Sequence, residues 1–135
     1  MRLVFVYGSL KRGLSNEHWL AGQEFVAEAV TEPGYRMYDW GGYPGLVETG
    51  SPDNGLAIHG EVWRVDDRCL AALDRLEDVD QGLYHRGLVR LQPPFTDVPV
   101  ETYYFSRSVA GLRDGGVDWR EACWVDGTGP TPDPA

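Results

Sequence analysis

The chain is poor in the residues that metal sites and disulfide scaffolds require. Its two cysteines, Cys69 and Cys123, are too few for a disulfide framework, and its three histidines lie on separate predicted elements without zinc-ligand spacing. The sequence therefore predicts no metal site, and nothing in it indicates a cofactor. A basic stripe is also missing, since 21 acidic residues against 12 basic ones leave a net charge of −9. This balance argues against nucleic acid and membranes as partners.

Long hydrophobic runs are missing as well. The N-terminal apolar run is too short for a signal peptide and no segment would span a bilayer, so we expect a cytoplasmic protein. A hydrophobic content of 42% over 135 residues fits one domain with a real core. The Gly/Pro-rich end predicts a flexible tail at 127–135 after a domain at 1–126. The composition predicts no particular oligomeric state and is compatible with a monomer.

Short strands dominate the predicted fold. The expected strands are Arg2–Val6, Glu24–Val30, Gly34–Asp39, Ile58–Val65, Tyr84–Leu91 and Val100–Phe105. The first of them is apolar and is bounded by a glycine loop, which is typical of a buried central strand. A short helix is expected up to Ala21, with Gly22 at its C-terminal end. Six strands with one well-defined longer helix predict an α+β domain, built as a partly closed barrel.

That longer helix carries a carboxylate in an unusual position. The segment from Asp66 to Asp78 has amphipathic spacing with Asp66 as its N-cap, and Glu77 falls inside the leucine stripe, four residues after Leu73. A carboxylate that faces a core needs a cationic partner, hydrogen bonds or a raised pKa. A raised pKa suits a general base or acid, but ion-pair networks produce the same pattern. Position alone therefore supports a structural role for Glu77 as often as a catalytic one.

A glycine-bearing loop from Tyr7 to Asn16 follows the first strand. Such a loop between a strand and a helix can direct several backbone N–H groups at one point, which suits a carboxylate or an oxyanion. Lys11 and Arg12 add positive charge that suits an anionic substrate group. The loop is not a Walker motif, because the Gly-Lys-Ser/Thr ending is absent. Taken alone, the motif favours the simpler explanation of a tight turn.

Several ordered elements resemble the gamma-glutamylcyclotransferase-like family. The loop from Tyr7 to Asn16 is similar to the family's Tyr-Gly-Ser/Thr-Leu loop. The stretch Leu73–Glu77, followed by Tyr84-His85-Arg86, is similar to its Leu-Asp-x-Leu-Glu and Tyr-x-Arg element. Further matches are Tyr43–Val47, Gly60–Trp63 and Tyr103–Phe105, so the resemblance runs from about residue 3 to residue 106. It is greatest to the gamma-glutamylamine cyclotransferase, AIG2-like branch, which includes deprotecting cyclotransferases of antibiotic biosynthesis.

This resemblance implies a fold, a reaction and a set of site residues. The fold is a small mixed β-barrel with flanking helices. In the reaction, the α-amine of a gamma-glutamyl amide attacks its own γ-carbonyl and releases 5-oxoproline and a free amine, without a metal or cofactor. Glu77 would move the proton from the α-ammonium to the leaving amine, a transfer worth about 10²–10⁴ in rate. Tyr7, Gly8, Ser9 and Leu10 would hold the α-carboxylate of the substrate.

Four further residues have alternative roles at this stage. Capping is the first explanation for Asn16 and substrate contact the second. Tyr84 and Tyr104 are candidates for substrate binding, although aromatic residues in strands more often fill a core. Arg86 is expected to pair with Glu77 or with another acid. A pair with Glu77 would lower the pKa of that carboxyl and weaken its assignment as a base.

The sequence leaves more than one function open. The first is an enzyme that acts on a small-molecule gamma-glutamyl amide, and the alternative is a non-catalytic ligand-binding or interaction module on the same fold. A third is an enzyme that removes a gamma-glutamyl protecting group from a biosynthetic intermediate. The retained Glu77 favours an enzyme, because a binding module is free to replace it. Trp119 and Trp124 either pack an extra element or cap the pocket.

Overall fold

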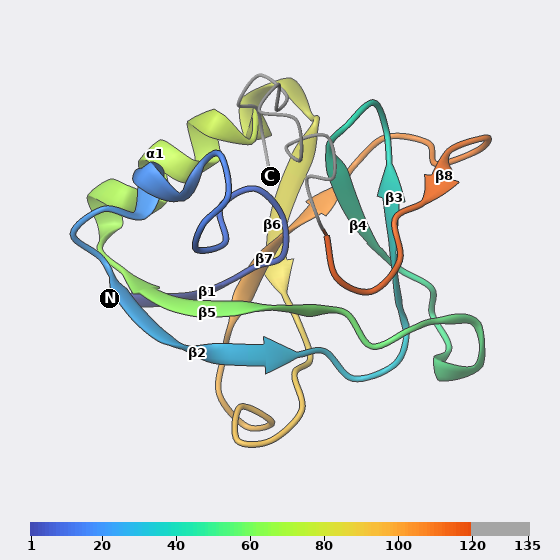
Figure 1. Cartoon of the computed structure of the whole chain (residues 1–135), viewed down its shortest axis with the longest axis horizontal. Helices are drawn as coiled ribbons and strands as arrows, with labels where there is room; N and C mark the ends of the chain where they lie inside the picture. Colours follow the sequence, from blue (N-terminus) through green and yellow to red (C-terminus); the bar gives the residue numbers. More distant parts are fainter. Residues whose placement is uncertain (120–135) are drawn as a thin grey trace.

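The computed structural model describes residues 1–119 of the chain (Figure 1). The strands are β1 Arg2–Val6, β2 Glu24–Val30, β3 Tyr35–Asp39, β4 Pro44–Glu48, β5 His59–Val65, β6 Tyr84–Leu88, β7 Glu101–Phe105 and β8 Arg113–Asp114. Within this part of the chain one α-helix, α1, spans Asp67–Leu76. Short 3₁₀ helices lie at Glu17–Leu20 (η1), Pro52–Asn54 (η2) and Val79–Gln81 (η3). None of these helices is long and apolar enough to cross a membrane.

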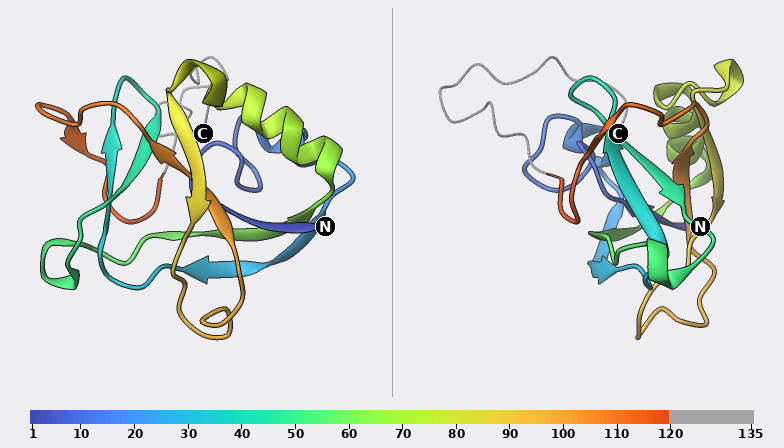
Figure 2. Two further views of the ribbon diagram at one scale, coloured as in Figure 1. Left: turned by 180° about the vertical axis from the view of Figure 1, so that it is seen from behind. Right: turned by 90° about the vertical axis from the view of Figure 1, so that its right-hand side faces the viewer.

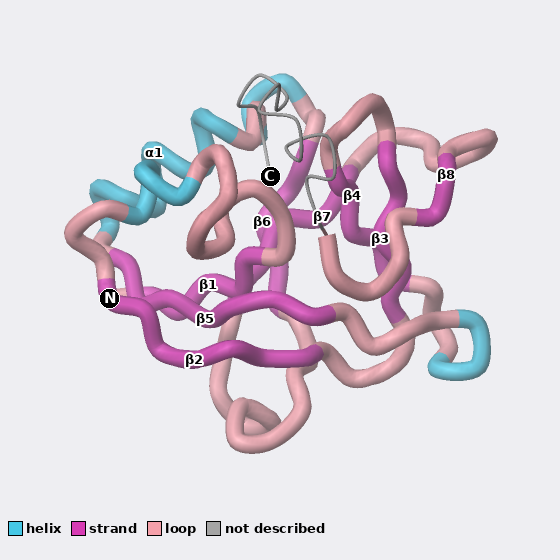
Figure 3. The backbone as a smooth tube through the Cα atoms, in the orientation of Figure 1, coloured by secondary structure: helices cyan, strands magenta, loops and turns pink. Residues whose placement is uncertain are grey.

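The strands form one mixed sheet in the order β2-β5-β1-β7-β4-β3-β8, with β6 paired to β7. β1 runs antiparallel to β5 and parallel to β7. The sheet curls so that the β2-β5-β1 part and the β3-β4 part are inclined to each other, and α1 lies along one side (Figures 2 and 3). The predicted α+β fold with a partly closed barrel is therefore confirmed.

Two of the eight strands were not among the predicted ones. β4 begins with Pro44 and Gly45, residues whose composition indicates a turn. Gly45 pairs with Tyr38 in the sheet, and glycine is needed at this strand position because a Cβ would lie 2.7 Å from Cγ of Phe105. β8 is only two residues long and has no periodicity to detect.

β1 is the buried central strand that its composition predicts, and its alternating side chains separate two cores. Phe5 belongs to a cluster in the barrel interior. Val4 and Val6 belong to the cluster beneath α1, to which the helix contributes Leu70 and Leu73. The leucine stripe of the helix therefore places the C-terminal end of α1 against the strands that carry the candidate site residues.

Gly60 tests how closely β5 packs on β1. A Cβ at Gly60 would lie 2.5 Å from the carbonyl oxygen of Val6 and 2.6 Å from Cζ of Phe5. We expect Gly60→Ala to lower the free energy of unfolding by about 1–3 kcal/mol, because neither neighbour can move without disturbing the core. Urea unfolding measures the change, with the exposed neighbour His59→Ala as the control. Equal stability of the two variants would contradict this packing.

Asp66 stabilises α1 in a pH-dependent way. The backbone N–H of Cys69 donates to its carboxylate at 2.7 Å, and this bond, with one from the Gln23 side chain, lowers the pKa of Asp66 from 3.8. A carboxyl with a lower pKa in the folded state stabilises the fold above its unfolded pKa, and the contribution disappears as the pH falls through the folded value. We expect Asp66→Ala to destabilise the protein at about pH 7 and much less at about pH 2. Urea unfolding at both pH values measures this difference, and an unchanged difference would contradict the capping role.

Candidate functional site

Glu77 follows α1 directly and has no exposed surface. Its backbone N–H donates to the carbonyl of Leu73 at 2.9 Å, so the last turn of the helix determines where its side chain leaves the backbone. Asp78 then adopts a left-handed conformation with φ 50° and turns the chain into η3. The prediction that Glu77 faces the core is confirmed, although the helix ends at Leu76, earlier than the amphipathic pattern suggests.

Tyrosines from β6 and β7 and from the loop after β1 surround this end of the helix. Burial raises the pKa of the Tyr7 phenol well above its usual value of 10.0, and the charges of Tyr84 and Glu77 raise it further. The pKa of Tyr103 is also raised, by burial, then by Asp74, and to a lesser extent by Glu77. Three predicted site residues are thus close enough to interact electrostatically: Tyr7 with both Tyr84 and Glu77.

The hydroxyl groups of Tyr7 and Tyr84 connect strands. Tyr7 donates to the carbonyl of Tyr103 at 2.6 Å and accepts from the N–H of Leu46 at 3.2 Å. Tyr84 donates to the carbonyl of Pro44 at 2.6 Å and accepts from the indole N–H of Trp40 at 2.9 Å. These bonds fix β4 against β6 and β7.

Tyr104 lies on the other face of the sheet. Its neighbours Tyr103 and Phe105 belong to the cluster beneath α1, whereas Tyr104 belongs to the interior cluster of the barrel. Its hydroxyl donates to the carbonyl of Leu88 at 2.7 Å, at the opposite end of β6 from Tyr84. The structure therefore does not bring the Tyr104 hydroxyl together with Tyr84.

Arg86 pairs with acids other than Glu77. Its guanidinium lies 2.6 Å from a carboxylate oxygen of Asp74 and 3.2 Å from one of Glu101. The hydroxyl of Tyr103 donates to the same oxygen of Asp74 at 2.6 Å. Of the two predicted partners for Arg86, Glu77 or another acid, the structure has the second.

The loop from Tyr7 to Asn16 is closed by two hydrogen bonds at its base. The backbone N–H of Asn16 donates to the carbonyl of Ser9 at 2.8 Å, and the amide Nδ2 of Asn16 donates to Ser9 Oγ at 2.9 Å. Both residues are buried. The capping explanation for Asn16 is wrong, because its side chain makes no capping hydrogen bond to η1 and turns to Ser9 instead. Leu10, which is fully buried, anchors the loop beneath α1.

The positive charges of this loop are paired with acids of the protein itself. Lys11 Nζ lies 2.7 Å from Asp118 and 2.9 Å from the carbonyl of Trp119. Arg12 pairs with Glu61, a buried acid that the sequence analysis missed. The sequence pattern could have predicted its burial. Glu61 is two residues before the apolar Trp63 in an alternating strand, so both side chains lie on the same face.

The C-terminal segment was predicted to add a packed element or to cap the pocket. Trp119 is buried in the interior cluster of the barrel, which agrees with the first alternative. Trp124, Cys123 and the predicted tail at 127–135 lie outside the described residues.

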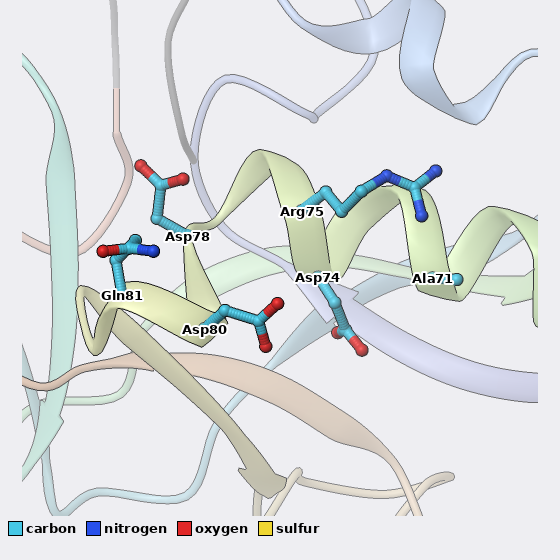
Figure 4. A pocket seen from close by; sticks show the side chains of 6 residues that line it. All are labelled: Ala71, Asp74, Arg75, Asp78, Asp80 and Gln81. Carbon is cyan, nitrogen blue, oxygen red and sulfur yellow. The ribbon is translucent and has the colours of Figure 1, made fainter.

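A surface depression of about 520 Å³ lies on the outer side of α1 and η3 (Figure 4). Its lining residues are Ala71, Asp74, Arg75, Asp78, Asp80 and Gln81. Three carboxylates against one guanidinium would repel the α-carboxylate of an amino-acid substrate, and Glu77 is not among the lining residues. This depression is therefore not the predicted substrate site. Among residues 1–119, no three His, Cys, Asp or Glu side chains are grouped so as to hold a metal ion.

Comparisons with known proteins match this arrangement to one family. Residues 4–121 match the family model described as gamma-glutamyl cyclotransferase, AIG2-like. A Vibrio cholerae protein named "Putative gamma-glutamylcyclotransferase" is 40% identical over 117 residues, which cover 87% of this chain and 94% of that protein. Gamma-glutamylaminecyclotransferase A of Danio rerio is 38% identical over 96 residues, covering 66% of this chain and 58% of its own length. The solution structure of protein ytfP from Escherichia coli has a TM-score of 0.65 and 34% identity, with 90% of this chain and 98% of that chain covered.

The bonds of the Tyr7 hydroxyl allow a direct test of its role. Tyr7→Phe removes the hydroxyl and leaves the N–H of Leu46 and the carbonyl of Tyr103 without this partner. We expect a loss of about 1–3 kcal/mol in the free energy of unfolding. Chemical denaturation measures it, with Tyr38→Phe at a partly exposed tyrosine as the control. A Tyr7→Phe protein as stable as the parent would show that this hydroxyl does not hold the strands together.

Proposed function

The chain belongs to the gamma-glutamyl cyclotransferase, AIG2-like family, and from that premise we propose that it is an enzyme that cyclises a gamma-glutamyl amide. The α-amine of the substrate attacks its own γ-carbonyl carbon, and the bond from that carbon to the amide nitrogen breaks. The products are 5-oxoproline and a free amine. The α-ammonium loses two protons as it becomes the ring N–H, and the leaving nitrogen gains two as it departs as an ammonium. Glu77 accepts these protons one after the other and delivers them to the leaving nitrogen, so that protons and charge balance within the site.

The burial of Glu77 is the observation that carries this proposal. A carboxylate without exposed surface is rare unless it has a specific task or a specific partner. Glu77 also ends a helix whose apolar face fixes its position, which provides the preorganisation that proton transfer requires.

The loop after β1 supplies the substrate-binding part of the proposal. The N–H groups of Lys11, Leu14 and Asn16 donate to carbonyls inside the loop. From the similarity of Tyr7–Leu10 to the family's Tyr-Gly-Ser/Thr-Leu loop, we assign the α-carboxylate of the substrate to the backbone of Gly8, Ser9 and Leu10, with the Ser9 hydroxyl oriented by Asn16. Tyr7, Tyr84 and Tyr104 complete the proposed site, and Tyr104 belongs to the same buried cluster as Tyr7.

For the leaving amine, the proposal names only a chemical class of substrate. The named activity of the Danio rerio relative supports a gamma-glutamyl amine over free glutathione. The same chemistry would also remove a gamma-glutamyl protecting group from a biosynthetic intermediate. The experiment is release of 5-oxoproline from gamma-glutamyl-lysine, gamma-glutamyl-alanine, glutathione and a gamma-glutamyl aminoglycoside-type amine. Turnover of one or more of these establishes the reaction, and no turnover of any of them would favour the alternative of a non-catalytic binding module.

Glu77→Gln tests the proton transfer itself. The replacement keeps the shape of the side chain and removes its ability to accept the proton, so we expect kcat to fall about 10²–10⁴-fold with an unchanged fold. Rates on the best substrate and a thermal melting curve measure both properties. Asp78→Asn, which removes the same charge from the exposed neighbouring residue, should keep the parent rate. A Glu77→Gln protein with the parent rate would refute the assignment, and one that unfolds would show that Glu77 is a structural charge.

A further inference from the structure

We propose that Glu61 is a positioning residue for substrate binding, because it holds the loop whose N–H groups receive the α-carboxylate of the substrate. Two parts of the loop are distinguished here: the outgoing arm, Gly8–Leu10, and the returning arm, Lys11–Asn16. Glu61 lies on β5 and touches the returning arm through Arg12. The inference rests on the function proposed above and extends it to a residue outside the reacting groups.

Both carboxylate oxygens of Glu61 accept hydrogen bonds from Arg12 in the loop. Oε1 accepts the backbone N–H of Arg12 at 3.0 Å, and Oε2 accepts Nε of the same residue at 3.1 Å. Oε1 also accepts the indole N–H of Trp63 at 3.1 Å. The Glu61 side chain is only 8% exposed, so these bonds form where water competes weakly. A buried carboxylate with two donors from one loop residue fixes the backbone of that residue and not only its side chain.

Arg12 is held from a second side as well. Its guanidinium carbon lies 3.6 Å from the centre of the Phe25 ring on β2. Glu28, also on β2, lies 3.8 Å from the guanidinium but is 82% exposed. The exposed pair with Glu28 is screened by solvent and contributes little. Glu61 is therefore the acid that determines where Arg12 lies.

The register of the sheet explains why Glu61 acts on the substrate loop. Glu61 is paired directly with Val6, the last residue of β1, and the outgoing arm begins two residues later. The returning arm contacts β5 through the bonds between Arg12 and Glu61. It is joined to the outgoing arm by the bonds from Lys11 N–H to the Gly8 carbonyl and from Asn16 N–H to the Ser9 carbonyl.

Arg12 lies between these two pairs of bonded residues, so Glu61 fixes the returning arm beside the contact of Lys11 with Asp118. A shift of the returning arm would displace Gly8 and Ser9, because the backbone hydrogen bonds of Lys11 and Asn16 connect the two arms. The binding N–H groups would then no longer converge on one point, and the substrate carboxylate would be held less tightly.

A KM-against-kcat comparison separates positioning from simple stabilisation. In Glu61→Gln, the side-chain amide cannot accept both Arg12 donors, because one of its ends is itself a donor. The α-carboxylate is bound alike in the ground state and the transition state, so a displaced loop should raise KM and leave kcat nearly unchanged. We expect KM for the best gamma-glutamyl amide to rise about tenfold, with kcat within about twofold of the parent. Glu28→Gln, at the other acid near Arg12, should leave both constants unchanged.

A second variant and a second readout keep the test independent of folding and of turnover. Arg12→Ala removes the guanidinium bond but keeps the backbone N–H on Glu61, so KM should rise by a smaller factor of about threefold. Backbone amide hydrogen exchange in Glu61→Gln should be faster over residues 12–16 than in the parent. A parent-like KM in Glu61→Gln, or a fall in kcat with KM unchanged, would overturn the positioning role.

The outcomes also distinguish failure of this inference from failure of the proposed function. If the parent cyclises no gamma-glutamyl amide, the proposed function fails, and the role of Glu61 in substrate binding fails with it. Faster amide exchange in Glu61→Gln would then show that the contact of Glu61 with Arg12 stabilises the loop but has no part in substrate binding. If the parent is active and Glu61→Gln has unchanged KM and unchanged exchange, the inference alone is wrong.

Discussion

Burial of the Glu77 carboxylate is the constraint that the surrounding structure has to satisfy. A charge removed from water is costly, and the cost is tolerated only where packing and neighbouring polar groups hold the charge in place. The leucine face of α1 packs on the sheet, and the left-handed Asp78 ends the helix at this point. The helix thus carries Glu77 to the strands on which Tyr84 and Tyr103 lie and to the loop that begins with Tyr7.

The basic side chains around the site are also held by specific partners. Within residues 1–119, three cations of the site elements are paired with acids: Arg86 with Asp74, Arg12 with Glu61, and Lys11 with Asp118. These pairs hold β6, β5 and the C-terminal segment to the elements that build the site. In the proposed function, the substrate carboxylate is therefore recognised by backbone N–H groups of the loop after β1.

Local periodicity in the sequence was sufficient to predict those parts of the fold that have one strong hydrophobic pattern. The capped helix, the central strand β1 and the inward position of Glu77 follow from residue spacing, and the structure has all three. β4 could not be found because its Pro-Gly start resembles a turn until Phe105 is known to pack against it. The partners of Asn16, Arg86 and Glu61 depend on which strands become neighbours, and no local pattern contains that information.

The central claim is that Glu77 and the loop after β1 bind two neighbouring groups of one gamma-glutamyl substrate, Glu77 the α-amine and the loop the α-carboxylate. The most direct test is a crystal structure with the product 5-oxoproline bound. The account predicts the ring nitrogen within about 2.6–3.2 Å of a Glu77 carboxylate oxygen, with the product carboxylate on the N–H groups of Gly8–Leu10. Product bound with its ring nitrogen away from Glu77, or bound in the acidic depression outside α1, would contradict it.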